Sequence, residues 1–214
     1  MGYAMNQVPE GVHVITDTYI QDRFDHVELA KYAGEAGASV IQFRDKKLVP
    51  GEMLPVIRNM KECCKQYKSQ LLVNDRVDLA MMADVNGVHL GQDDLPIERV
   101  RELVGEDKYI GGSASNMEEA LDVEEKGADY VGFGHIFQTT TKQKGYEPRG
   151  LENLERVATK LNIPLIAIGG ITLENAEKVM QAGANGFAVG SAVCASDDPE
   201  KAARQLVEIY ERFR

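Results

Sequence analysis

Two basic residues separated by a single position, Arg44 and Lys46, directly follow the apolar run 40–43. Alternate residues of an extended segment project to the same side, so both side chains can reach one anion. Arginine and lysine bind phosphate through charge-assisted hydrogen bonds. The spacing therefore favours a phosphate contact over the alternative that both side chains are solvated loop charges.

Two acidic residues, Asp75 and Asp94, follow the apolar runs 71–73 and 87–90. Each could cap the helix that comes next, which is the commonest role of an aspartate in such a place. Carboxylates at neighbouring strand ends, close to a pair of cations, more specifically indicate Mg²⁺ held between the protein and a polyphosphate. We therefore expect both residues to be metal ligands.

Small residues follow the last two apolar runs of the chain, as Gly169 with Gly170 and as Gly190 with Ser191. Backbone N–H groups of such loops, together with a helix N-terminus, form phosphate sites in barrels. The alternative is a pair of tight turns in which glycine only supplies a left-handed conformation. Because both loops are small, we expect phosphate to bind there.

The longest irregular stretch, residues 138–150, is polar and contains Thr139, Thr141 and Lys142. Loops of this length inside compact domains are usually functional, and this one predicts a mobile lid. Its hydroxyls and its cation are suited to closing over an anionic substrate, although a merely solvated loop would have the same composition.

The histidines differ in their placement. His135 follows the apolar run 130–133, where a histidine can act as a general acid or base, or can only hydrogen-bond at a rim. We interpret His13, His26 and His89 as structural or surface residues.

A repeated unit positions these residues: an amphipathic helical stretch, a small turn with glycine, and a short β-rich run. The turns lie at 36–38, 86–87, 127–128 and 183–186, where glycine suits a helix end with positive φ. The apolar runs are 12–15, 40–43, 71–73, 87–90, 109–112, 130–133, 165–168 and 187–189. Apolar residues recur with helical spacing in stretches such as 50–67 and 116–126, which predicts helices there. Asn116 with Glu119 predicts a capping box at the start of the second.

The apolar runs are continuous, which is typical of strands buried on both faces of a parallel sheet. A doubly wound open sheet has the same alternation of strands and helices. Eight runs, and the lack of a Gly-x-Gly-x-x-Gly turn after the first, favour the closed form. We predict an α/β fold, a single (β/α)8 TIM barrel in one domain over residues 1–214, with its chemistry at the carboxyl ends of the strands.

Charge and composition limit the classes of partner. The 214 residues carry 24 basic and 34 acidic side chains, a formal charge of −10, so the overall field repels nucleic acid and anionic membranes. No apolar stretch is long enough to span a bilayer and no signal pattern starts the chain, which predicts a cytoplasmic protein. Three cysteines without metal or redox spacing predict reduced thiols. The sequence leaves open whether the chain forms a homo-oligomer.

Five groups of residues, in order along nearly the whole chain, resemble the successive motifs of thiamine phosphate synthase. They are Gln42 with Arg44 and Lys46, residues 74–80, residues 87–94, Thr139 with Thr141 and Lys142, and residues 168–172. Five motifs in the same order along the chain make the probability of a chance resemblance small. The resemblance implies an enzyme that joins hydroxymethylpyrimidine pyrophosphate to hydroxyethylthiazole phosphate and releases pyrophosphate.

The resemblance also implies roles for individual residues. Mg²⁺ would be held by Asp75 and Asp94. The pyrophosphate would contact Arg44, Lys46, Asn74 and Lys142, the pyrimidine Gln42 and Ser113, and the thiazole phosphate Thr139, Thr141, Gly170, Gly190 and Ser191. In the family reaction pyrophosphate leaves to give a stabilised pyrimidine methyl cation, which the thiazole nitrogen captures. Arg44, Lys46, Ser113, Lys142 and His135 are the catalytic candidates.

Two departures from the family pattern keep other functions open. His135 stands where the synthase usually has proline, and residues 133–135 resemble the related thiazole tautomerase, whose catalytic histidine matches this position. Residues 113–115 also lack the histidine common at the third place of that motif. The retained metal and pyrophosphate residues favour the synthase over a tautomerase that uses His135 as acid and base. They also argue against a non-catalytic barrel that only binds a phosphate ligand.

Overall fold

The computed structural model describes residues 10–139, 145 and 147–214, and these form a ring of strands surrounded by helices. The elements are, in order, β1 (Gly11–Thr16), α1 (His26–Glu35), β2 (Val40–Phe43), α2 (Pro50–Tyr67), β3 (Gln70–Asn74), α3 (Val77–Ala83), β4 (Gly87–Leu90), α4 (Ile97–Val104), β5 (Tyr109–Ala114), α5 (Met117–Glu125), β6 (Tyr130–Gly134), α6 (Gly150–Ala158), β7 (Leu165–Ile168), α7 (Ala176–Gln181), β8 (Gly186–Val189), α8 (Ser191–Cys194) and α9 (Pro199–Glu211).

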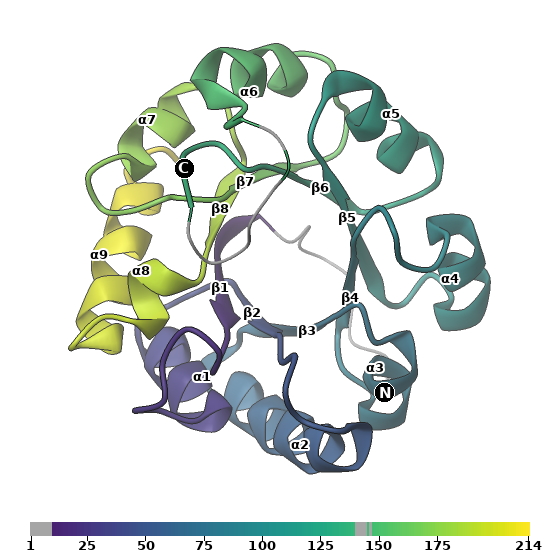
Figure 1. The fold of residues 1–214 in the computed structure, drawn as a ribbon, viewed down its shortest axis with the longest axis vertical. Helices are drawn as coiled ribbons and strands as arrows, with labels where there is room; N and C mark the ends of the chain where they lie inside the picture. Colours follow the sequence, from purple (N-terminus) through teal and green to yellow (C-terminus); the bar gives the residue numbers. More distant parts are fainter. Residues whose placement is uncertain (1–9, 140–144, 146) are drawn as a thin grey trace.

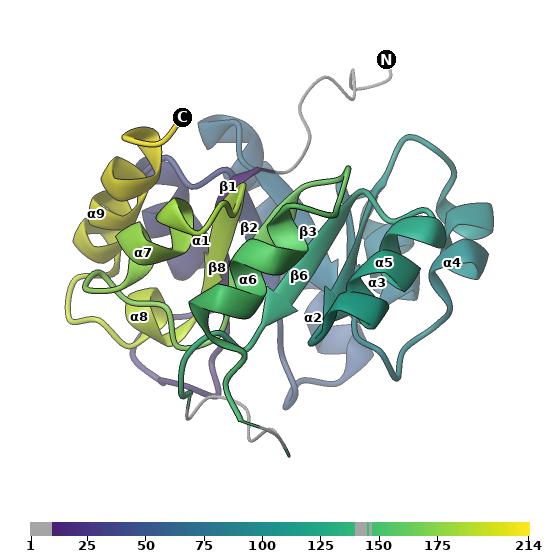
Figure 2. The same cartoon turned by 90° about the horizontal axis from the view of Figure 1, so that it is seen from above.

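All eight predicted strands are confirmed, and they pair in sequence order as a closed parallel barrel. Closure is made by β1 and β8, where Val12 lies beside Phe187. Figure 1 looks onto the ring with the helices outside it, and Figure 2 shows the same ring from the side. The predicted (β/α)8 TIM barrel is therefore confirmed, and the doubly wound alternative is wrong.

Two apolar layers hold the barrel together. The larger one lies between the strands and the helices and includes Ile41, Val73 and Phe133. The smaller one fills the inside of the ring with six buried residues: Val40, Leu72, Tyr109, Tyr130, Ile166 and Ala188. Side chains alternate along a strand, so residues two positions beyond this inner layer also face the inside of the ring. Gln42 and Asn74 occupy such positions at the carboxyl ends, and Ser113 lies four positions beyond Tyr109 on the same inward-facing row of β5.

The predicted helices are confirmed, with one difference at a cap. The helix over 50–67 is observed with those bounds as α2. Asn116 caps α5 by accepting a hydrogen bond from the Glu119 N–H, but the Glu119 carboxylate accepts from the N–H of Ser115, one residue before the cap. Half of the predicted capping box is therefore formed. Among the described helices, none is both long and apolar enough to cross a lipid bilayer.

Glycine ends helices at three of the four predicted turns. Gly37, Gly127 and Gly183 have φ of 90°, 85° and 87°. Before β4 the prediction is wrong, because Asp84 adopts the left-handed conformation at φ 50° and the glycine comes later, inside the strand. Gly87 is required there for space: a Cβ would lie 2.1 Å from the backbone oxygen of Tyr109 on β5.

Replacing Gly87 with alanine should therefore push β4 away from β5. We expect Gly87→Ala to lower the free energy of unfolding by about 3 kcal/mol, the upper part of the range for overpacked cores. Urea denaturation with circular dichroism measures it. Gly51→Ala is the control, because a Cβ on Gly51 in α2 meets no atom within 4 Å. Equal midpoints for the two variants would contradict the steric role of Gly87.

Candidate active site

Arg44 is held at the barrel mouth by a carboxylate from the neighbouring strand. It follows β2, and its Nη1 is paired with Oδ2 of Asp17, which follows β1 and whose side chain is 2% exposed. Asp17 lies two residues beyond Ile15, so it belongs to the inward-facing row of β1. Asp17 was not among the residues expected from the sequence, although the strand alternation that links Arg44 to Lys46 marks it as inward-facing.

Lys46 reaches from β2 across to the residue that follows β3. Its Nζ lies 2.6 Å from Oδ2 of Asp75, and its side chain is 52% exposed. Asp75 has a φ of 62°, a left-handed conformation that non-glycine residues rarely adopt and that concentrates at functional sites. Its N–H donates to the carbonyl of His89 on β4. Lys46 and Asp75 therefore meet at the strand ends, and their binding of substrate and metal stays a prediction.

Asp75 and Asp94 form a pair of interacting carboxyl groups. Although burial would raise the pKa of Asp75, hydrogen bonds with Lys46 and Asp94 and the charge of Lys46 lower it. Burial and the neighbouring Asp75 raise the pKa of Asp94, whose Oδ2 accepts a hydrogen bond of 2.6 Å from the Gly91 N–H. Like charges held this close favour a cation between them.

The alternative that these aspartates cap helices is wrong. Helix α3 begins at Val77 with Arg76 as its N-cap, and no side chain bonds to that cap. Helix α4 begins at Ile97 with Pro96 in the same position. The carboxylates of Asp75 and Asp94 therefore interact with Lys46, with one another and with the Gly91 N–H, and not with a helix end.

Deeper in the same mouth lie Gln42 and Ser113, which are expected to contact the pyrimidine, and Asn74, which is expected to contact the pyrophosphate. Gln42 on β2 is 3% exposed, and Asn74 at the end of β3 is half-buried. Ser113 on β5 is half-buried, and its Oγ lies 3.0 Å from Nε2 of His89. Gln92 donates to the Ser113 carbonyl at 2.5 Å. The interior position of these residues follows from strand alternation, whereas the contacts of His89 and Gln92 needed the folded chain.

His135 and the glycines after β7 are packed against each other. His135 is 5% exposed, and its carbonyl accepts a hydrogen bond of 2.8 Å from the Arg149 N–H. A Cβ on Gly169 would lie 2.3 Å from Cβ of His135, and one on Gly170 would lie 2.3 Å from the Gln138 carbonyl oxygen. Gly169 and Gly170 also have φ of 97° and 67°. Turn geometry and close approach therefore both require glycine here, and phosphate binding stays a prediction.

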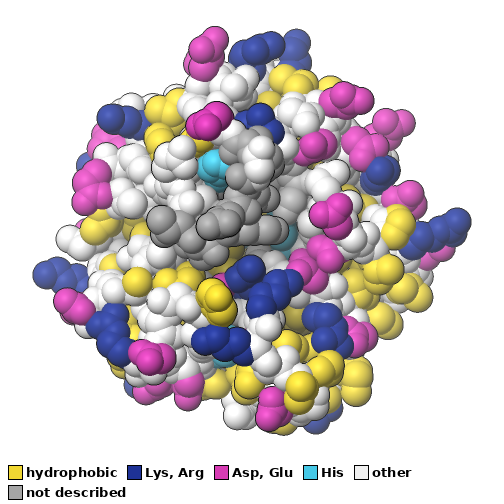
Figure 3. Space-filling view, in the orientation of Figure 1, with side chains coloured by type: hydrophobic (Ala, Val, Ile, Leu, Met, Phe, Trp, Pro, Cys, Tyr) yellow, Lys and Arg dark blue, Asp and Glu magenta, His cyan; other side chains and the backbone are white. Residues whose placement is uncertain are grey.

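The remaining candidates border the same face. Gly190 precedes the short helix α8, and Ser191 is exposed. Thr139 is half-buried, while Thr141 and Lys142 lie outside the described residues, as does part of the predicted lid. Figure 3 shows Lys and Arg side chains gathered near the middle of this face, over the part of the ring where Figure 1 places β2 and β3. A basic patch thus lies at the mouth of an acidic protein.

Comparisons with known proteins agree with this arrangement. The sequence profile described as thiamine monophosphate synthase matches residues 12–193. A thiamine-phosphate synthase of Chlorobium luteolum is 46% identical over 88% of this chain and 89% of the relative, and one of Archaeoglobus fulgidus is 43% identical over 95% and 94%. The solved thiamine phosphate pyrophosphorylase of Pyrococcus furiosus superposes with a TM-score of 0.88 at 37% identity, covering 96% of this chain and 98% of that one.

The chain belongs to the thiamine monophosphate synthase family.

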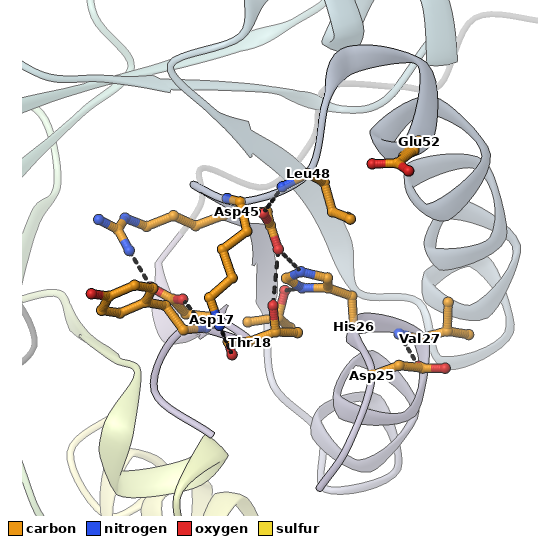
Figure 4. A network of polar contacts seen from close by, with 12 residues as sticks. Asp17, Thr18, Asp25, His26, Val27, Asp45, Leu48 and Glu52 are labelled. Carbon is orange, nitrogen blue, oxygen red and sulfur yellow. Dashed lines mark hydrogen bonds and ion pairs between the residues drawn. The ribbon is translucent and has the colours of Figure 1, made fainter. Parts of the chain in front are cut away.

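In this member of the thiamine monophosphate synthase family, a buried network holds the loop that carries the two cations (Figure 4). The Asp45 carboxylate lies 2.9 Å from Nε2 of His26 and accepts a 2.9 Å hydrogen bond from the Thr18 hydroxyl. It also accepts from the N–H groups of Lys47 and Leu48 at 2.6 and 2.7 Å. Burial alone would raise the pKa of Asp45, but these hydrogen bonds, His26 first among them, lower it to about 2.

The network joins β1, α1 and the loop after β2. Nδ1 of His26 lies 2.8 Å from the hydroxyl of Thr16, so one imidazole ring connects β1 with Asp45. Asp45 stands between Arg44 and Lys46 in sequence, and fixing it limits the positions both cations can take. The prediction that His26 is structural is confirmed by its burial, at 3% exposed. No local pattern indicates its partner, because His26 and Asp45 lie on different elements.

Asparagine at position 45 should therefore destabilise this family member in a pH-dependent way. A pKa lowered from 3.8 to about 2 means that ionised Asp45 stabilises the fold above pH 3.8 and that this contribution is lost as the pH falls towards 2. We expect Asp45→Asn to reduce the free energy of unfolding by about 2 kcal/mol near neutral pH, with a smaller gap below pH 3.8.

Urea titrations of the wild type and the variant at a series of pH values measure this gap. Asp107→Asn makes the same change on an exposed residue and is the matched control. A gap that stays constant down to the lowest pH at which the protein folds would contradict the role given to the Asp45 charge.

Proposed function

We propose that this chain is a transferase that condenses hydroxymethylpyrimidine pyrophosphate with hydroxyethylthiazole phosphate to give thiamine phosphate and pyrophosphate. The observation that carries the proposal is the meeting of Arg44, Lys46, Asp75 and Asp94 at one mouth of a barrel of this family. Relatives that are thiamine-phosphate synthases support the reaction implied by the sequence motifs. The substrates are small phosphorylated compounds. The sequence also predicts a cytoplasmic location and a single domain over residues 1–214, and both agree with this function.

The same carboxylates fit the Mg²⁺ expected from the resemblance. Asp75 and Asp94 offer hard oxygen ligands side by side, and their mutual repulsion is what a cation would relieve. Among the described residues, no three His, Cys, Asp or Glu side chains form a group that could hold a metal. Two are sufficient for Mg²⁺, which usually binds one or two carboxylates together with substrate phosphates and water. When bound, Mg²⁺ supplies positive charge to the departing pyrophosphate.

The protein's own cations stabilise the leaving group. Negative charge on the pyrophosphate grows as its bond to the pyrimidine methylene breaks, so Arg44 and Lys46 contact it most strongly in the transition state. Asn74 and Lys142 would complete this contact. Asp17 and Asp75 hold the two cations before substrate arrives, which limits the reorganisation needed at the moment of reaction.

The two rings must be held while water is excluded, because water would capture the pyrimidine methyl cation. Gln42 and Ser113 would bind the pyrimidine in the buried part of the mouth. Thr139, Thr141, Gly170, Gly190 and Ser191 would bind the thiazole phosphate. With these assignments the thiazole would lie beside the segments after β6, β7 and β8, and the pyrophosphate beside those after β2 and β3, with Lys142 contributed from the segment between β6 and α6.

The tautomerase and the non-catalytic barrel receive less support. His135 is 5% exposed and packs on Gly169, which fits a structural role better than proton transfer to a substrate. A barrel that only bound a phosphate ligand would have no use for the adjacent carboxylates of Asp75 and Asp94. We therefore assign the synthase reaction to the charged mouth and not to His135.

Purified protein mixed with both substrates and Mg²⁺ should form thiamine phosphate, and EDTA should abolish this. Asp75→Asn should slow turnover on the order of 100-fold, as expected when one charge-stabilising group is lost from a transition state. Chromatographic detection of thiamine phosphate measures both effects. Asp78→Asn is the matched control, because Asp78 is an exposed carboxylate on α3 that pairs with Arg76. Unchanged turnover in EDTA would refute the metal assignment.

His135→Asn should leave thiamine phosphate formation largely intact, because capture of a cation by the thiazole nitrogen needs no base. The same variant should lack any activity that tautomerises a thiazole carboxylate phosphate. Parallel assays of both reactions on folded protein measure the difference. Loss of synthase activity with normal substrate binding would mean that His135 takes part in the synthase step.

A further inference from the structure

Three side chains form a hydrogen-bonded chain that runs through the interior of the barrel to the mouth. The hydroxyl of Tyr130 on β6 lies 2.9 Å from Nδ1 of His89 on β4. Nε2 of the same imidazole lies 3.0 Å from Oγ of Ser113 on β5. Ser113 is the residue expected to contact the pyrimidine. The chain therefore connects a wholly buried phenol to a substrate contact.

Two glycines leave space in the barrel interior for the side chains of Tyr130 and His89. A Cβ on Gly111 of β5 would lie 2.1 Å from Cζ of Tyr130, and a Cβ on Gly132 of β6 would lie 2.8 Å from Cε1 of His89. Both glycines occupy inward-facing positions, where larger residues fill the ring at other strands. The edge of His13 packs on the Tyr130 ring at 5.3 Å between centroids. The interior is thus shaped around the tyrosine and histidine pair.

The positions of the protons follow from the donors and acceptors. Burial raises the pKa of Tyr130, so its hydroxyl keeps its proton and needs an acceptor. Among the described residues, the hydrogen-bond partner of that hydroxyl is Nδ1 of His89. An imidazole that accepts at Nδ1 carries its proton on Nε2, which then donates to Ser113 Oγ.

We propose that Tyr130 and His89 are positioning residues that fix the Ser113 hydroxyl as a hydrogen-bond donor to a ring nitrogen of the pyrimidine substrate. Ser113 accepts from His89, so its own proton points to the mouth. Ring nitrogens of a pyrimidine only accept, and a neutral hydroxyl orients the ring without protonating it. The identity of the substrate rests on the proposed function, whereas the order of protons in the chain does not.

Nitrogen-15 NMR of protein labelled in its four histidines tests the proton order directly. We expect the proton of the His89 ring on a pyrrole-like Nε2 and a pyridine-like Nδ1 that accepts from Tyr130; His89→Gln assigns the signals. Tyr130→Phe keeps the ring but removes the donor, and should leave a mixture of tautomers. A proton on Nδ1 in the wild type would overturn the hydrogen-bond order whatever the substrate is.

Binding measurements test the contact with substrate. Two pyridine analogues, each with one ring nitrogen of the pyrimidine diphosphate replaced by C–H, are compared with the parent by calorimetry. For the wild type, one analogue should bind about 10- to 100-fold more weakly, as expected for one lost hydrogen bond in a buried site. Ser113→Ala should bind the parent and both analogues alike, and Tyr130→Phe should show reduced discrimination.

Inorganic pyrophosphate is the control ligand, and its affinity should be the same in all three proteins, because Arg44 and Lys46 are unchanged. Full discrimination by Ser113→Ala would overturn the role of Ser113 as donor. If the wild type does not bind the pyrimidine diphosphate at all, the proposed function fails together with the substrate contact, even when the NMR result is as expected.

Discussion

Ring closure of parallel strands is the constraint on which the site depends. Each strand is hydrogen-bonded on both sides, so the alternation of side chains is fixed and every second residue must face the inside. Along β2 this row runs from Val40 in the inner apolar layer to Gln42 and then to Arg44 and Lys46 at the mouth. A shift by one residue would move both cations to the outside and expose the layer beneath them.

The mouth combines two electrostatic environments. At its rim, Arg44 and Lys46 are each paired with an aspartate, and a second carboxylate, Asp94, is held against the first. Deeper inside, polar side chains are hydrogen-bonded to one another, from Tyr130 through His89 to Ser113. This division suits a reaction in which pyrophosphate leaves at the rim while positive charge develops on a ring held below it.

Much of this arrangement could be predicted from the sequence, and the omissions have a common cause. The apolar runs and the glycine turns are local patterns, and they located every strand. The one turn assigned wrongly, where Asp84 and not Gly87 is left-handed, failed because glycine was required there by β5 and not by the helix end. Alternation along β1 marks Asp17 as inward-facing, but its pairing with Arg44 and the pairing of His26 with Asp45 leave no trace in local periodicity.

The sequence by itself determined the order of the elements, the barrel, and the residues that reach its carboxyl ends, because strand alternation and helical period are set by neighbouring residues. Only the tertiary structure decided which charged and hydrogen-bonding groups pair. Asp17 meets Arg44 across 27 residues and His89 meets Tyr130 across 41. Such contacts depend on which strands become adjacent when the ring closes, and the energy of each pair depends on the burial that closure creates.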